Sequence, residues 1–88
     1  MNRVLKAILC CLINKSKFGE SHTPEDRLIK PKIKYINSSE RKEFEKEYQQ
    51  MIKQGIILRV KKRTGKGTDW HISLDSHKTE ELNRLLNN

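Results

Sequence analysis

The chain has 88 residues, of which 34% are apolar and 34% are charged, and its formal net charge at pH 7 is +8. A chain of this length buries only about 60% of its unfolded surface, which excludes two separate cores. The apolar residues are clustered and periodic, which excludes a disordered chain and indicates one small folded domain over residues 1–88.

The positive charge is concentrated in three parts of the chain. Segments 1–19, 27–36 and 55–68 carry +4, +4 and +5, whereas segments 20–26 and 69–88 carry −3 and −2. Clustered positive segments favour a nucleic-acid partner over an anionic membrane surface or an acidic protein.

The chain begins with a predicted helix near residues 3–14, in which apolar side chains follow helical spacing. The apolar run Ala7–Ile13 has seven residues, too few for a membrane span of about 20. Cys10 and Cys11 are adjacent and cannot easily bridge to one another, and no CxxC spacing is present, so we expect a reducing, cytoplasmic setting and no membrane association.

A second helix is predicted near 24–30. Thr23 and Pro24 are typical of a helix start, and acidic residues follow in the first turn. Pro31 disfavours helical geometry at Lys30, so we expect this helix to stop there and Ile33–Ile36 to be extended.

A third helix is predicted over 38–54, capped by Asn37 or Ser38 and ended by Gly55. Its buried face has the spacing i, i+4, i+7, i+8. The opposite line holds Lys42, Lys46, Gln49, Gln50 and Lys53. Lys suits phosphates and guanine, and Gln suits adenine, so this line has the chemistry of a DNA-contacting face. The alternative is an ordinary solvent-facing helix surface.

A β-hairpin is predicted from strands at 56–61 and 69–74. Ile56, Leu58 and Val60 alternate in the first strand, and Trp70, Ile72 and Leu74 alternate in the second, which gives each strand one face fit for a core. The connection 62–68 contains two glycines and is expected to project as a loop. Between Gly55 and Thr68 there are five positive charges and no acid: Arg59, Lys61, Lys62, Arg63 and Lys66.

The chain closes with a predicted helix at 76–86, which lies outside the core unit of about 3–74. Leu82, Leu85 and Leu86 form a small apolar edge. That edge has two interpretations: it packs on the first helix, or it joins a homodimer through the N-terminal or C-terminal helix.

The helix that ends in Lys53-Gln54-Gly55-Ile56-Ile57, followed by a basic hairpin, resembles the C-terminal half of a winged helix-turn-helix domain over roughly residues 37–74. The resemblance implies a small α+β, winged-helix-like domain of three to four helices with a C-terminal β-hairpin. It also implies a third helix in the major groove and a hairpin, called the wing, on the backbone or minor groove. The family normally places a small first strand before its second helix, and the extended segment expected at 33–36 departs from that order.

These observations predict non-catalytic binding of double-stranded DNA, as a small transcription regulator or a replication accessory protein. The predicted contacts, expected to form one continuous positive surface, are Lys42, Lys46, Gln49, Lys53, Arg59, Lys61, Lys62, Arg63 and Lys66. One alternative is a basic inhibitor, encoded by a mobile element, that binds an acidic protein surface.

A second alternative is a ribonuclease that uses His71 as general acid or base. Such an enzyme needs a second proton-transfer group, from His22, His77 or a Glu. The three histidines are scattered and the cysteines lack metal-ligand spacing, so the sequence predicts no catalytic residues, no metal and no cofactor.

Overall fold

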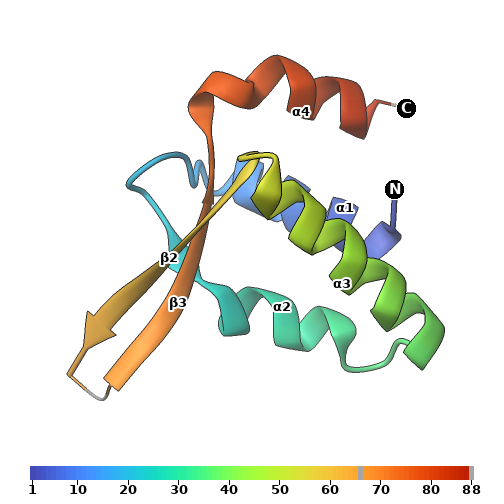
Figure 1. The fold of residues 1–88 in the computed structure, drawn as a ribbon, viewed down its shortest axis with the longest axis horizontal. Helices are drawn as coiled ribbons and strands as arrows, with labels where there is room; N and C mark the ends of the chain where they lie inside the picture. Colours follow the sequence, from blue (N-terminus) through green and yellow to red (C-terminus); the bar gives the residue numbers. More distant parts are fainter. Residues whose placement is uncertain (66, 88) are drawn as a thin grey trace.

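The structure is a computed structural model and describes residues 1–65 and 67–87. The described part contains four α-helices and a three-stranded antiparallel sheet, which makes a small α+β domain (Figure 1). In chain order the elements are α1 (Arg3–Asn14), β1 (Thr23–Pro24), α2 (Glu25–Ile33), α3 (Ser38–Lys53), β2 (Ile57–Thr64), β3 (Gly67–Leu74), a 3-10 turn (Ser76–Lys78) and α4 (Thr79–Leu86).

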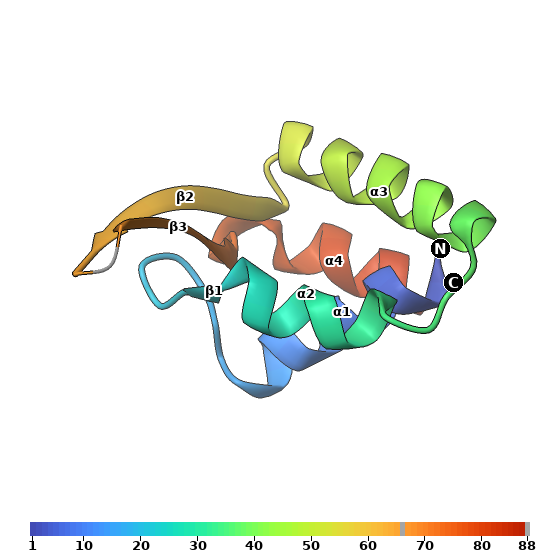
Figure 2. The same cartoon turned by 90° about the horizontal axis from the view of Figure 1, so that it is seen from below.

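The helices gather at one end of the molecule and the β2–β3 hairpin projects away from them (Figures 1 and 2). Leu5, Ile8, Leu9 and Leu12 of α1 are at most 1% exposed and run through the middle of the core. Side chains from α2, α3, the sheet and α4 close around this row. The first helix, predicted near residues 3–14, is therefore confirmed.

The β2–β3 hairpin, residues 57–74, is called the wing below. Its paired strands extend farther than the sequence predicted. Pairing runs from Ile57 opposite Leu74 out to Thr64 opposite Gly67, so most of the connection predicted as a loop at 62–68 is paired strand. Backbone hydrogen bonds of a hairpin do not depend on side-chain polarity, so the charged, exposed stretch pairs as well as the apolar one.

The face of β2 that meets the core differs from the predicted one. Residues directly opposite one another in an antiparallel pair share a face, and Arg59 lies opposite Ile72. The core face therefore carries Ile57, Arg59 and Lys61 rather than the predicted alternation of Ile56, Leu58 and Val60. Val60 is 44% exposed. Ile56 is also buried, but it lies before the strand begins. Counting the alternation from Ile56 therefore assigned the wrong residues of β2 to the core face.

The second helix continues through Pro31 to Ile33, so the predicted stop at Lys30 and the extended segment at 33–36 are wrong. Proline removes one intrahelical hydrogen bond. Leu28 and Ile29 are buried in the core and Ile33 packs against it. This tertiary packing outweighs the local preference of the residue before a proline.

A short strand, β1, precedes α2 and pairs with β3, with Thr23 opposite Ile72. Two residues carry no alternation that could reveal a strand. The element order α1-β1-α2-α3-β2-β3 thus has its first strand before the second helix, and residues 34–37 connect α2 to α3 as a turn. This turn stands where an extended segment was expected between the second and third helices.

Gly55 ends α3 with a φ of +77°, a left-handed conformation that disfavours side chains with a Cβ. Nothing lies within 4 Å of a Cβ added there. We expect Gly55→Ala to lower the free energy of unfolding by about 1–2 kcal/mol through backbone strain alone. Gly55→Asn should cost less, because Asn tolerates this conformation. Urea denaturation measures both, and equal losses would contradict the backbone explanation.

Candidate nucleic-acid interface

The outward face of α3 carries four side chains that are all exposed in the structure: Lys42, Lys46, Gln49 and Lys53. We call this set the α3 stripe. Phe44, Tyr48 and Met51 occupy the opposite face and are 2–6% exposed in the core. The helical spacing therefore separates a packing face from a cationic face, as the sequence predicted.

Three of the four glutamates of α3 bond to the start of α1. Glu47 accepts a 2.9 Å hydrogen bond from the backbone N–H of Asn2, and Glu43 accepts one of 3.0 Å from the Asn2 side chain. Glu40 forms an ion pair with Arg3 at 3.1 Å. These three acids are thus held on the flank of α3 that faces α1, away from the α3 stripe, whereas Glu45 pairs with Arg41.

Asn2 organises this flank and was not singled out by the sequence reasoning. Its Oδ1 accepts hydrogen bonds from the N–H groups of Val4 and Leu5 at 2.9 and 3.2 Å, which caps α1. The residue is only 4% exposed. An Asn directly before an apolar helical run is a recognisable cap signal, but its bonds to α3 have no signature in sequence.

Glu25, at the start of α2, ties the wing to the helices. Its carboxylate accepts bonds from Arg59 at 2.6 and 3.0 Å and from the Tyr48 hydroxyl at 2.6 Å. The Arg59 guanidinium also lies 3.9 Å from the centre of the Trp70 ring. We predicted that Arg59 binds phosphate. In the structure it forms an internal ion pair with Glu25, so we assign it a structural role.

This network changes the acidity of its members. Desolvation by burial raises the pKa of the Glu25 carboxyl, but the hydrogen bonds from Arg59 and Tyr48 outweigh it and leave the pKa below its usual value. Burial and the neighbouring Glu25 raise the pKa of the Tyr48 hydroxyl. The pair Glu25–Arg59 is therefore charged at neutral pH.

The remaining described cations of the wing, Lys61, Lys62 and Arg63, are all exposed. Lys61 lies opposite Trp70 and Lys62 opposite Asp69, so successive cations alternate between the two faces of the hairpin. The Lys61 ammonium lies 5.7 Å from the centre of the Trp70 ring. Lys66, also predicted to contact phosphate, lies outside the described residues.

The α3 helix and strand β2 run along the same side of the molecule, with α1 and α2 on the other (Figure 2). A shallow cavity of about 300 Å³ lies between α2 and α3 and reaches Arg59 of β2; we call it the gap, and its lining includes Glu25, Asp26 and Glu45. Asp26 pairs with Lys30 at 3.7 Å and Glu45 with Arg41 at 3.5 Å.

The expected continuous positive surface is therefore interrupted. Each of the three acids in the gap has a basic partner, so the gap is close to neutral. The α3 stripe and the exposed wing cations are two separate positive regions that flank it.

A pair of histidines lies where β1 joins the wing. The Nδ1 atoms of His22 and His71 are 3.0 Å apart, and their rings are nearly perpendicular. Desolvation by burial, followed by the charges of Lys62, His71 and Lys17, lowers the pKa of His22. The structure thus supplies a partner for His71, but the direct contact leaves no space for a phosphodiester between the two rings.

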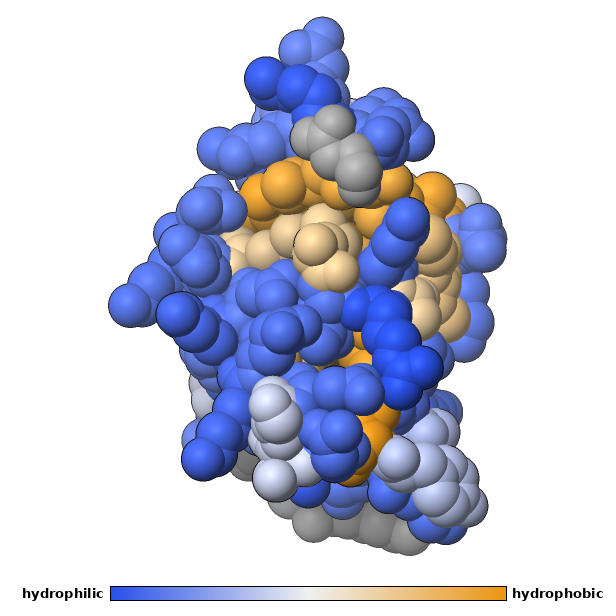
Figure 3. Space-filling model, turned by 90° about the vertical axis from the view of Figure 1, so that its right-hand side faces the viewer, coloured by the Kyte–Doolittle hydropathy of each residue, from blue (hydrophilic) through white to orange (hydrophobic). Residues whose placement is uncertain are grey.

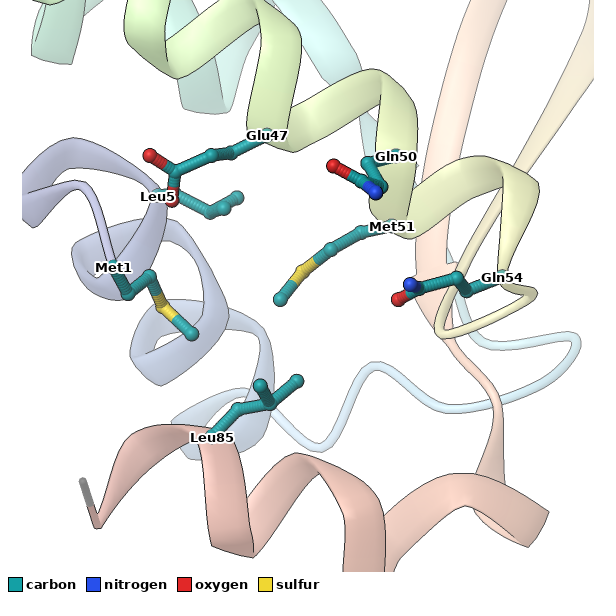
Figure 4. Close-up of a pocket in the computed structure, with 7 residues that line it drawn as sticks. All are labelled: Met1, Leu5, Glu47, Gln50, Met51, Gln54 and Leu85. Atoms are coloured by element: carbon teal, nitrogen blue, oxygen red, sulfur yellow. The ribbon is translucent and has the colours of Figure 1, made fainter.

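A separate, apolar hollow of about 300 Å³ lies between α1, α3 and α4. Met1, Leu5, Met51 and Leu85 point into it, and the polar ends of Glu47, Gln50 and Gln54 border it (Figure 4). Figure 3 shows apolar side chains gathered across the upper half of the face that bears both chain ends. Both helices predicted to mediate dimerisation line this hollow, and the dimer itself stays a prediction.

Comparisons with protein-family models, with curated proteins and with solved structures give no match. Within residues 1–65 and 67–87, no helix has the length and apolar character needed to cross a bilayer. The same residues contain no cluster of three or more His, Cys, Asp or Glu side chains arranged to hold a metal ion. The functional argument therefore depends on the arrangement of charge alone.

Proposed function

We propose that this chain binds double-stranded DNA without catalysing a reaction, as a regulator of transcription or an accessory of replication. One observation supports this most: the acids of α3 are bonded to the start of α1 or to Arg41. That arrangement leaves the α3 stripe positive and on the same side of the molecule as β2 (Figure 2).

The dimensions of α3 suit a major groove. A helix of 16 residues is about 24 Å long and 10–12 Å wide with its side chains. The major groove of B-DNA is about 12 Å wide. In this arrangement Lys42, Lys46 and Lys53 contact phosphates or guanine, and Gln49 is placed to read an adenine.

The wing supplies the second contact. Because its cations alternate between faces, the hairpin presents positive charge to phosphates on either side of it. Lys61, Lys62 and Arg63 extend beyond the point where Glu25 fixes the strand. The neutral gap between the two regions then spans the distance between the groove and the neighbouring phosphates, and the Glu25 network sets the angle between them.

Binding to short DNA duplexes over a salt series tests the proposal with three matched pairs of substitutions. Lys42→Gln with Lys46→Gln neutralises the α3 stripe, and Lys62→Gln with Arg63→Gln neutralises the wing. Each pair should reduce the slope of log affinity against log salt by about 1.8 units if each side chain contacts one phosphate. The control pair, Lys6→Gln with Lys15→Gln, removes equal charge from exposed positions on α1 and the turn after it.

The control pair should change the slope far less than the other two. Equal reductions in all three pairs would show that only net charge matters, and would contradict a defined interface. Absence of duplex binding, together with a stoichiometric protein complex that survives nuclease treatment, would favour the acidic-protein alternative instead.

A further inference from the structure

The His22–His71 pair has no part in the proposed DNA interface. His22 lies in the loop before β1, and His71 lies in β3 opposite Pro24, so β1–β3 pairing brings them together. Their Nδ1 atoms are 3.0 Å apart, their ring centres are 4.8 Å apart, and their planes meet at 85°. Ring nitrogens this close either share a proton or share an ion.

The separation of the two nitrogens is compatible with a shared ion. Two imidazoles that bind one metal at about 2.0–2.1 Å place their nitrogens about 2.9 Å apart at an angle of about 90° at the metal and about 3.3 Å apart at the tetrahedral angle, so the observed 3.0 Å lies within this range. A linear N–H···N bond of the same length would separate the ring centres by about 5.2 Å. The ring centres are 4.8 Å apart, so at least one ring is bent away from the line that joins the nitrogens.

We propose that His22 and His71 form a two-histidine site for a divalent transition-metal ion such as Zn²⁺ or Ni²⁺. Imidazole nitrogen is a preferred ligand for these ions and a poor one for Mg²⁺. Both rings coordinate through Nδ1, which places the ring proton on Nε2. Among the described residues no third ligand joins the pair, so water or a group from another molecule completes the coordination.

The site has a structural consequence. An ion held by both side chains links the α1–β1 loop to the base of the wing. Binding to the folded state alone stabilises that state in proportion to the logarithm of metal concentration. The ammonium groups of Lys17 and Lys62, which act on His22, oppose a second cation, so the affinity is well below that of a closed four-ligand zinc site.

The test uses the full chain, stripped with a chelator and titrated with ZnCl₂ at neutral pH by calorimetry, with MgCl₂ as the control ion. We expect one zinc per chain and a rise in melting temperature with zinc but not with magnesium. His22→Gln and His71→Gln should each weaken zinc binding at least about tenfold. The matched control is His77→Gln, since His77 is an exposed histidine held by Asp75, and it should bind zinc like the parent.

A second measurement guards against variants that fail to fold. In the unmodified chain, NiCl₂ should broaden the imidazole proton signals of His22 and His71 before those of His77. Failure of zinc to bind at millimolar concentration overturns the proposal. So does zinc binding that survives both substitutions, which would locate the ion elsewhere, for example at Cys10 and Cys11.

Lys62→Gln separates this site from the DNA interface. Removing the opposing charge should tighten zinc binding by about two- to five-fold, while the same substitution weakens DNA binding if Lys62 contacts phosphate. Zinc affinity that falls with Lys62→Gln would contradict the electrostatic arrangement at the histidines. The zinc measurements therefore test the metal site whether or not the chain binds DNA.

Discussion

Glu25→Gln is expected to lower the free energy of unfolding by about 2–3 kcal/mol at pH 7. The side chains of Glu25 and Arg59 are 12% and 28% exposed, so the substitution leaves a partly buried guanidinium without its counter-charge. The Tyr48 hydroxyl also loses a charged acceptor at 2.6 Å. For a domain stabilised by roughly 5–10 kcal/mol this is a large fraction of the total.

The effect should depend on pH in a defined direction. Because the pKa of Glu25 is lower in the folded chain than its ordinary value of 4.5, the folded state favours the charged form. The stabilisation is fully present above the unfolded pKa and is lost as pH falls through the folded pKa. Unfolding curves of the parent and Glu25→Gln should therefore differ at pH 7 and converge in acid.

The neighbouring acid provides the control. Asp26 forms an ion pair with Lys30, and both side chains are about three-quarters exposed. Asp26→Asn should cost no more than about 0.5 kcal/mol. A loss from Asp26→Asn as large as that from Glu25→Gln would show that net charge, rather than the buried network, explains the effect.

Glu25→Gln also bears on the interface. The substitution frees the Arg59 charge beside the wing, so the folded protein should show a steeper salt dependence of DNA binding, by up to about one unit of slope. An unchanged slope would mean that Arg59, still stacked on Trp70, does not reach a phosphate even when unpaired.

The sequence predicted the elements whose signals are long and periodic. The apolar stripe of α1, the i, i+4, i+7 face of α3 with Gly55 at its end, and the two strands of the wing are all present. Their periodicity reports burial directly, since every third or fourth helical residue and every second strand residue meets the core.

Predictions from the sequence were wrong where tertiary contacts outweigh a local signal. Pro31 favours a helix end, but buried Leu28 and Ile29 hold α2 together through it. Ile56 and Ile57 are both apolar, so only pairing with β3 decided which face of β2 meets the core. Arg59 looks like any other cation of the basic run, and its partner Glu25 lies 34 positions away.

Asn2→Ala is the second substitution from which we expect a large loss, about 2–3 kcal/mol of unfolding free energy. Removal of a helix cap costs about 1 kcal/mol. The side chain of Asn2 also donates to Glu43 at 3.0 Å from a position only 4% exposed. Loss of a charge-assisted bond at such a site adds about 1.5–3 kcal/mol, and solvent access to Glu43 offsets part of that sum.

Two further substitutions separate capping from the bonds between α1 and α3. Asn37 caps α3 through one exposed hydrogen bond to the N–H of Glu40 at 2.8 Å, so Asn37→Ala should cost only the cap, about 1 kcal/mol. Asn2→Asp keeps the cap oxygen but replaces the donor to Glu43 with a third carboxylate beside Glu43 and Glu47. Like charges at this distance repel, so Asn2→Asp should still lose about 1–2 kcal/mol.

Urea denaturation of the three variants decides between the two roles of Asn2. If Asn2→Asp is as stable as the parent protein, Asn2 acts only as a helix cap. A loss close to that of Asn2→Ala would instead make the α1–α3 bonds the larger contribution. The bonds to α1 keep Glu40, Glu43 and Glu47 turned away from the α3 stripe. Asn2→Ala should accordingly weaken DNA binding by the folded protein, because Glu43 is then free to swing toward the phosphates, whereas Glu47 keeps its bond to the backbone N–H of residue 2.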